Sequence, residues 1–352
     1  MDMSLLLIVF LLVVIGLVIL YSTSSYNGQV KFHDSFYYLK KQAFATALGV
    51  VLMLLVAGMD YHIWQRMAVF GYLAAVALSV AVMLFGREIN GSKRWLALGP
   101  FSFQPSEFAK VALILFLADL VTKNVKTIGK MWTLCRIMFW ILPIVGLVGA
   151  SNLSTAIIIL GIGVILIFVA SPKYAQFVWM GIAGAGFMGI FLALESYRLE
   201  RLAIWRNPEK YEKGYQTLQG LYAIGSGGVF GVGLGNSVQK LGFVPEAQND
   251  MIFSIICEEL GLAGSVLIVL LFLMLIWRFF LIASECRDLF GALIATGAMA
   301  HMMIQVILNI AVVTNTIPNT GITLPFISYG GTSVMFLLIE MGLVLSVSQV
   351  VD

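Results

Sequence analysis

Apolar runs about as long as a lipid bilayer is thick recur along this whole chain. A helical span needs about 20 such residues to cross roughly 30 Å of hydrocarbon. Runs of that kind cover 4–21, 43–59, 67–86, 107–121, 174–195, 252–277, 290–313 and 332–349. They are continuous, unlike the alternating strands of roughly ten residues in a membrane barrel. The sequence therefore predicts an all-α polytopic membrane protein that forms a single domain, 1–352.

Composition supports this fold class. Of the 352 residues, 60% are hydrophobic and only 11% are charged, whereas a soluble domain carries about 25% charged residues. The net charge of +3 is too small to indicate binding to nucleic acid. The three histidines are scattered, and the cysteines show no metal-ligand spacing, so the pattern indicates no metal site.

The stretch from Ile137 to Ala170 is apolar but too long for one span, since it would form a helix of roughly 50 Å. We predict a break at Ala150-Ser151-Asn152, where Asn152 can cap the second helix. This gives ten spans, with nine as the alternative. Lysine and arginine in the loops do not decide the orientation, so the residues alone leave the topology open.

A long polar interruption, 196–250, separates the seventh and eighth spans. Its first part is basic and aromatic, which suits a segment on the membrane surface. A glycine-rich run, 225–235, follows and lacks the ending of a phosphate-binding P-loop. Asp250 then stands directly before an apolar run. An acid there can cap a helix or serve as a general base, and the residues leave both open.

The interruption at 86–106 ends where Pro105 and Ser106 predict a helix start, with Ser106 as the N-cap. Glu107 and Lys110 follow on one face of that helix. Charges at the membrane boundary normally pair or face a polar cavity. The pair either fixes helix packing or lines a substrate cavity.

The last interruption, 315–333, is rich in glycine and proline, which break helices. Irregular backbone is tolerated at membrane depth only where protein or water covers it. We therefore expect a re-entrant loop or one folded against the bundle. Carboxylates near cations, as in these interruptions, suit transfer from a lipid-linked phosphate donor, and they also suit ion or proton transport.

Three sets of motifs occur in a specific order along the chain. They are Arg94-Trp95 with Gln104-Pro105-Ser106-Glu107-x-x-Lys110; Gly231-x-Gly233-x-Gly235-Asn236-Ser237-Val238-Gln239-Lys240-Leu241 with Pro245-Glu246-Ala247-x-x-Asp250; and Leu324-Pro325-Phe326-Ile327-Ser328-Tyr329-Gly330-Gly331. In these motifs the chain closely resembles the SEDS family (shape, elongation, division, sporulation). It is more similar to the FtsW and SpoVE division-sporulation branch than to RodA. It departs from the family pattern at Ser151-Asn152-Leu153 and at Gln248-Asn249.

The resemblance implies a bundle of ten spans in the bacterial cytoplasmic membrane, with both termini cytoplasmic and 196–250 as a large extracellular loop. It also implies a peptidoglycan glycosyltransferase that polymerises lipid II at the outer face for septal or spore wall synthesis. Asp250 would be catalytic, and undecaprenyl pyrophosphate would leave. The residues expected to bind substrate are Glu107, Lys110, Arg94, Gln239, Lys240, Glu246 and Ser328.

The same resemblance implies a class B penicillin-binding protein, a transpeptidase, as the partner. Basic residues of the long loop, with or without a divalent cation as cofactor, would balance the charge of the pyrophosphate. The alternatives are a lipid II flippase, an elongation polymerase of the RodA type and a scaffold for the transpeptidase.

Overall fold

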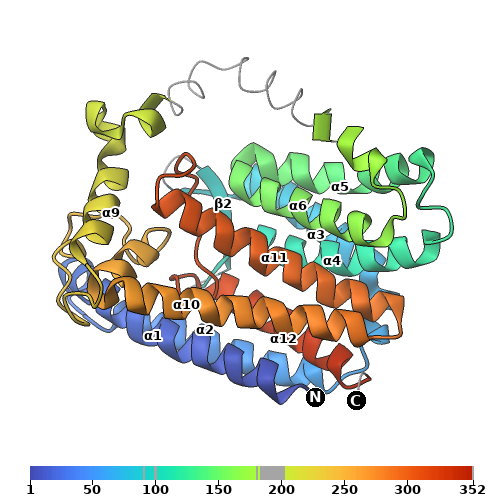
Figure 1. Ribbon diagram of the computed structural model, residues 1–352, viewed down its shortest axis with the longest axis horizontal. Coiled ribbons are helices and arrows are strands. Elements are labelled where there is room, and N and C mark those ends of the chain that lie inside the picture. The colour runs from blue at the N-terminus through green and yellow to red at the C-terminus, as the bar shows by residue number, and fades with distance from the viewer. Residues whose placement is uncertain (90–91, 99–100, 180, 183–202, 351–352) are drawn as a thin grey trace.

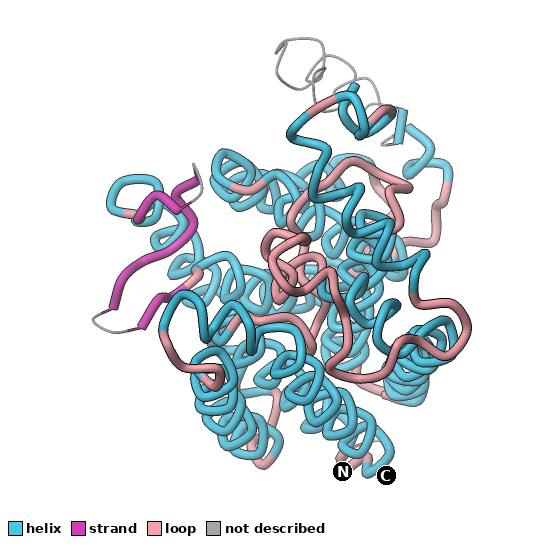
Figure 2. Tube along the Cα trace, turned by 90° about the vertical axis from the view of Figure 1, so that its left-hand side faces the viewer, coloured by secondary structure: helices cyan, strands magenta, loops and turns pink. Residues whose placement is uncertain are grey.

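The computed structural model describes residues 1–352 apart from 90–91, 99–100, 180, 183–202 and 351–352. Long helices lie side by side in a bundle (Figure 1), and a small three-stranded antiparallel sheet lies at one side of it (Figure 2). The elements are α1 (Met3–Phe32), α2 (Tyr37–Ala57), α3 (His62–Phe85), β1 (Arg87–Ile89), β2 (Ser92–Leu98), β3 (Phe101–Phe103), α4 (Pro105–Asn124), α5 (Met131–Ser151), α6 (Leu153–Ala170), the 3₁₀ turns η1 (Pro208–Lys210) and η2 (Glu212–Gly214), α9 (Tyr215–Ser226), α10 (Ile252–Glu285), α11 (Leu289–Val313) and α12 (Gly331–Ser348).

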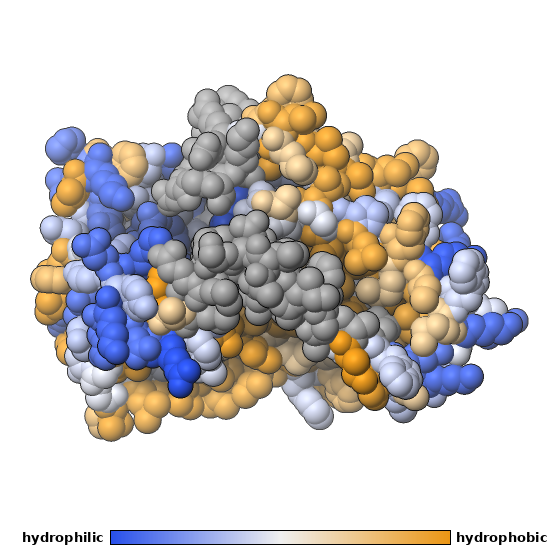
Figure 3. Space-filling view, turned by 90° about the horizontal axis from the view of Figure 1, so that it is seen from above, coloured by the Kyte–Doolittle hydropathy of each residue, from blue (hydrophilic) through white to orange (hydrophobic). Residues whose placement is uncertain are grey.

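Within the described residues, eight helices are long and apolar enough to cross a membrane. They are α1, α2, α3, α5, α6, α10, α11 and α12. Helix α4 coincides with the predicted span 107–121 but carries more charge, and the predicted span 174–195 lies largely outside the described residues. The polytopic all-α fold is thus confirmed, while the number ten stays a prediction. Figure 3 shows hydrophilic surface at both ends of the molecule and hydrophobic surface between them.

The break in the stretch 137–170 is confirmed. Asn152 has an extended backbone between α5 and α6, and its side chain accepts a hydrogen bond from the Thr155 N–H at 3.3 Å. The prediction of the cap at Ser106 is wrong. Pro105, whose φ is preset for a helix, takes the first helical position, so Gln104 and not Ser106 precedes α4. The Gln104 side chain makes no capping bond. The interruption at 86–106 contains the three-stranded sheet.

Helix α4 lies in the middle of the bundle, where it contacts α3, α6 and α11. All its side chains from Ala109 to Asp119 are buried. A helix covered on every side has no face for lipid, and this explains why its polar residues can be tolerated. Glu107 and Lys110 therefore lie inside the protein and do not face lipid.

The two ends of the chain lie together at one end of the bundle, and α9 lies at the opposite end (Figure 1). The Asp2 N–H donates to the Ser348 hydroxyl at 3.0 Å, and Asp2 also pairs with Arg278 of α10. Helices α2 and α12 pack very closely: a Cβ on Gly342 would lie 2.6 Å from the Met53 carbonyl oxygen. The last helix is therefore embedded among the first ones.

The glycine-rich run, 225–235, replaces part of the hydrogen-bond ladder of α10. Helix α10 is interrupted at Gly261, whose φ of 66° and ψ of −165° are non-helical. The carbonyls of Glu258 and Glu259 accept instead from Val232 N–H at 2.9 Å and from Gly233 N–H at 3.0 Å. On the other side of the kink, the N–H groups of residues 262 and 263 bond to carbonyls of residues 228 and 229. The loop is thus hydrogen-bonded into the helix itself.

We predict that Gly261→Ala unfolds the protein at a lower temperature. A Cβ there would lie 2.3 Å from the Gly231 nitrogen, in a backbone conformation that L-residues avoid. The expected loss is about 3 kcal/mol or more of unfolding free energy, measured by thermal unfolding in detergent. The control is Gly146→Ala within α5, where a Cβ meets nothing within 4 Å. That variant should be neutral or slightly more stable, and equal behaviour of the two variants would contradict the prediction.

Candidate active site

Asp250 ends the long interruption and lies just before α10. Its neighbour Met251 is the residue that precedes the helix, and no side chain caps this helix end. Its carboxylate Oδ1 accepts a hydrogen bond from the Gln216 side chain at 3.4 Å, and its carbonyl accepts one from Asn309 at 2.9 Å. The capping alternative is therefore not observed, and the Asp250 side chain is left for other chemistry.

Burial raises the pKa of Asp250 to about 6. The neighbouring Glu246 carboxylate raises it further, because two like charges disfavour each other. Hydrogen bonds from backbone N–H groups and from Gln216 act in the opposite direction but do not outweigh these effects. A partly buried carboxyl of this kind is ionised at neutral pH and can still take up a proton, as a general base requires.

Glu107 and Lys110 form a buried ion pair, with Lys110 Nζ 3.1 Å from Glu107 Oε2. The Ser333 hydroxyl of α12 donates to the same Glu107 oxygen at 2.8 Å. Lys110 Nζ also donates to the Gln305 side-chain oxygen of α11 at 3.1 Å. Lys110 is only 1% exposed, so the pair joins α4 to α11 and α12 within the protein.

The network continues deeper into the bundle through His301 of α11. One ring nitrogen lies 2.9 Å from Gln305 Oε1, and the other lies 2.7 Å from Glu340 Oε2 of α12. In the other direction, the Gln305 side chain donates to the Thr323 carbonyl at 3.1 Å. Gln305 thus connects the charged interior to the loop between α11 and α12.

One face of α11 connects the charge pair to Asp250. His301, Gln305 and Asn309 are spaced four residues apart, so they share that face. The Asn309 side chain donates both to the Asp250 carbonyl and to the Ile322 carbonyl, the latter at 2.6 Å. These three polar residues recur every four positions in a largely apolar helix. That spacing was a signal for this face that sequence reasoning missed.

The loop between α11 and α12 folds against the bundle, as predicted. Ile322, Leu324 and Phe326 are buried. Ser328 is also buried: its hydroxyl donates to the Asn249 carbonyl at 2.6 Å and accepts from the Leu324 N–H at 2.8 Å. Ser328 therefore fastens the loop to the residue before Asp250.

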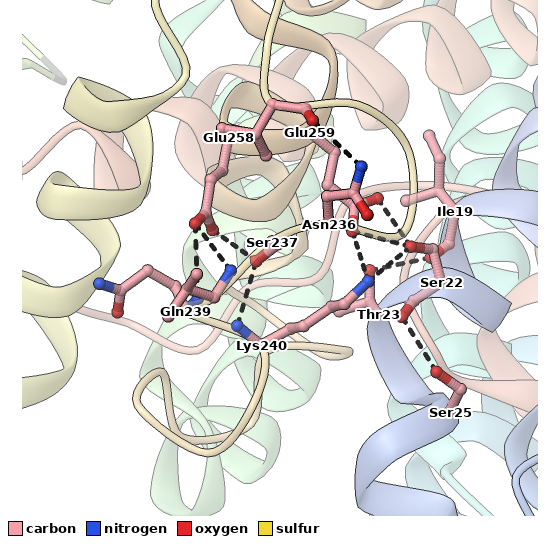
Figure 4. Close-up of polar contacts among 12 residues, drawn as sticks. Ile19, Ser22, Thr23, Ser25, Asn236, Ser237, Gln239, Lys240, Glu258 and Glu259 are labelled. Carbon is pink, nitrogen blue, oxygen red and sulfur yellow. Dashed lines mark hydrogen bonds and ion pairs between the residues drawn. The ribbon is translucent and has the colours of Figure 1, made fainter.

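Lys240 forms a buried ion pair with Glu259 of α10, with Nζ 2.6 Å from Oε1 (Figure 4). The Ser22 hydroxyl of α1 donates to both oxygens of Glu259, at 2.8 and 2.7 Å. Lys240 Nζ also lies 3.0 Å from the Ser22 oxygen. Because the ammonium is enclosed by these groups, Lys240 holds the loop between α1 and α10.

The adjacent carboxylate, Glu258, binds the backbone N–H groups of the same loop. It accepts from the Ser237 hydroxyl, from the Val238 N–H at 3.0 Å and from the Gln239 N–H at 3.4 Å (Figure 4). The Gln239 side-chain oxygen is buried and has no partner among the described residues. Two neighbouring acids of α10 thus fix the loop at two places.

The remaining expected site residues are spread around this centre. Glu246 lies four residues before Asp250 and has a φ of 54°. Its carboxylate accepts a hydrogen bond from the Asn249 side chain. Arg94 of β2 donates from Nε to the Ser151 carbonyl at 3.0 Å, at the break between α5 and α6. In the described part of the chain, no three His, Cys, Asp or Glu side chains converge as a metal site would require.

Comparison with known proteins identifies the family. The family model described as "Cell cycle protein", which covers FtsW, RodA and SpoVE, matches residues 2–352. The chain belongs to this family. It is 40% identical to stage V sporulation protein E of Bacillus subtilis, with 99% of this chain and 97% of that protein covered. It is 35% identical to a probable peptidoglycan glycosyltransferase FtsW of Trichlorobacter lovleyi, with 99% and 93% covered.

Solved structures of FtsW/RodA/SpoVE proteins share the fold. One match is a chain from a structure described as "Structural coordination of polymerization and crosslinking by a peptidoglycan synthase complex". It superposes on this chain with a TM-score of 0.86 at 30% identity. That match covers 99% of this chain and 97% of the other. The rod shape determining protein RodA of Thermus thermophilus gives a TM-score of 0.73 at 29% identity, with 99% and 96% covered. The resemblance to the SEDS family is thereby confirmed along the whole chain.

Proposed function

We propose that this chain is a peptidoglycan glycosyltransferase that polymerises lipid II into glycan strands at the outer face of the cytoplasmic membrane. Relatives that match nearly the whole chain carry the name of that activity. The observation that carries the proposal is Asp250: Gln216 donates to its carboxylate, Asn309 donates to its main-chain carbonyl, and burial raises the pKa of the carboxyl to about 6. Asp250 lies two residues before the start of α10, and that end of the helix faces away from the two chain termini (Figure 1).

In the proposed reaction the Asp250 carboxylate removes the proton from the 4-hydroxyl of an incoming lipid II sugar. The hydroxyl oxygen then forms a bond to the anomeric carbon of the growing chain. The bond from that carbon to the pyrophosphate oxygen breaks, and undecaprenyl pyrophosphate leaves with both bonding electrons. The proton stays on Asp250 until solvent takes it. Positive charge near the leaving group would stabilise it.

The proposed roles of the other residues follow their burial. Glu107 and Lys110 are enclosed, so we assign them to hold α11, and with it Asn309 and Asp250, in place. Lys240 likewise stabilises the loop rather than meeting substrate. Glu246 is half-buried and close enough to act on the Asp250 carboxyl, so we assign it as a substrate contact.

We further propose a class B penicillin-binding protein as the partner that crosslinks the glycan. The support is the similarity to a chain from a peptidoglycan synthase complex that couples polymerization with crosslinking.

The test is glycan synthesis by the purified chain in detergent. Lipid II is supplied with and without the cognate transpeptidase, and products are resolved by gel electrophoresis. A detergent micelle has no two sides, so a flippase makes no polymer there. Polymer that depends on this chain supports the proposal, and its absence in both arms, with the transpeptidase present and folded, overturns it.

The rate should depend on pH in a specific direction. Asp250 acts as a base only when ionised, and its pKa of about 6 lies above the ordinary 3.8. The kcat/KM for lipid II should therefore fall about tenfold for each pH unit below about 6 and level off above it. The measurement is the initial rate from pH 5 to pH 8. A flat profile over this range would mean that the base titrates lower and is not Asp250 in this environment.

A further inference from the structure

Gln216 and Asn319, from distant parts of the sequence, form a chain of hydrogen bonds that ends at the Asp250 carboxylate. Gln216 of α9 donates from Nε2 to Asp250 Oδ1 at 3.4 Å and to the Pro245 carbonyl at 3.3 Å. Asn319, in the loop between α11 and α12, donates from Nδ2 to Gln216 Oε1 at 3.3 Å. The Asn319 oxygen in turn accepts from the Gly321 N–H at 3.2 Å.

This chain of contacts fixes which way each amide points. A side-chain amide has a donor end and an acceptor end of similar shape, and only its partners distinguish them. A backbone N–H can only donate, so Gly321 requires the Asn319 oxygen on its side. The Asn319 NH₂ then faces Gln216, whose oxygen must turn toward it. The Gln216 NH₂ is left to face the Asp250 carboxylate.

We propose that Gln216 is a positioning residue for the reaction, and that Asn319, oriented by the Gly321 N–H, keeps the donor end of Gln216 on the Asp250 carboxylate. The inference rests on the proposed function of Asp250 as the base. Asn309 donates to the main-chain carbonyl of Asp250 at 2.9 Å. Backbone and carboxylate are thus held by separate residues.

The hydrogen bond from Gln216 opposes the effects that raise the pKa of Asp250. Burial and the Glu246 carboxylate both raise the pKa of Asp250, while the hydrogen bond from Gln216 lowers it. Glu246 is the charged group that acts on Asp250 among the described residues. Gln216 is the side chain that favours the ionised carboxylate, and the other hydrogen bonds in that direction come from backbone. Its loss leaves Asp250 protonated at a higher pH.

The first test replaces Gln216 with alanine and records polymerisation from pH 5 to pH 9. The midpoint of the pH–rate profile should move up by about one unit. The rate should fall about fivefold at pH 6, approach a tenfold loss below that pH, and recover most of the loss above pH 8. The matched control is Gln219→Ala on the same helix, a glutamine with no hydrogen bond to Asp250 in the described structure. A profile of Gln216→Ala that is lowered equally at every pH would overturn the proposal.

The second test asks whether Asn319 acts through Gln216. Asn319→Asp keeps the shape but offers Gln216 only an acceptor, so Gln216 turns its oxygen toward Asp250. The midpoint should then move up further than in Asn319→Ala. In the Gln216→Ala background, Asn319→Ala should change nothing more, since interacting residues are not additive. Additive shifts would contradict the relay.

These outcomes are separable from those of the proposed function. If wild-type protein makes no glycan, or Asp250→Asn retains full activity, the proposed function fails. If wild type is active and Asp250→Asn is inactive, but Gln216→Ala keeps the wild-type midpoint, only the positioning role fails.

Discussion

Asp250→Asn should lower the rate of lipid II polymerisation by about 10²–10⁴-fold, the range that general-base catalysis supplies. Asparagine has nearly the same shape and can keep the contact with Gln216 through its oxygen, but it cannot accept the proton of a sugar hydroxyl. The measurement is the initial rate of glycan formation with purified variant and wild type at pH 7.5.

The matched control for this change is Glu209→Gln, which removes an exposed acid of the same long interruption. It should polymerise at the wild-type rate. Thermal unfolding of both variants should match wild type, because Asp250 makes no capping bond whose loss would weaken α10. A folded Asp250→Asn protein with the wild-type rate would remove Asp250 from the mechanism.

Lys240→Met should destabilise the protein by about 3–5 kcal/mol, the usual cost of leaving a buried charge unpaired. Lys240 and Glu259 are both almost completely buried, and the pair fixes the loop that leads to Asp250. The unfolding temperature in detergent should therefore drop strongly, and polymerisation should drop with it.

Two comparisons isolate the cause. The double variant Lys240→Met, Glu259→Met removes both charges at similar volume and should recover much of the lost stability. Lys40→Ala breaks an ion pair in which the lysine side chain is 69% exposed, and it should change the unfolding temperature little. A single Lys240→Met variant as stable as Lys40→Ala would show that the buried pair does not stabilise the loop.

Much of the fold was predictable because each membrane span satisfies its own backbone. A run of apolar residues such as 290–313 has one stable structure in lipid, whatever its neighbours do. The cap at Asn152 is equally local, since its partner is three residues away. Asp250 and the pair of Glu107 and Lys110 were recognised from their positions at the ends of such runs and from the family resemblance.

The remaining structure depends on partners that are far apart in the sequence. Nothing local in the glycine-rich run indicates that it would take over hydrogen bonds of a helix near residue 261. Lys240 was expected to bind substrate. Its partner Glu259 belongs to a segment that reads as a membrane span, so the sequence did not predict the buried ion pair. Gln216 and Asn319 are 103 residues apart, and no spacing rule brings them together.

The close packing of α12 against α2 has a consequence for biosynthesis. The groove that receives Gly342 is made early, by residues around Met53, while the segment that fills it is made after nearly all the others. During translation α2 therefore enters the membrane before α12 exists to cover its face around Met53. The charged interior, which includes Glu107 of α4 and Ser333 of α12, cannot close until α12 has been synthesised.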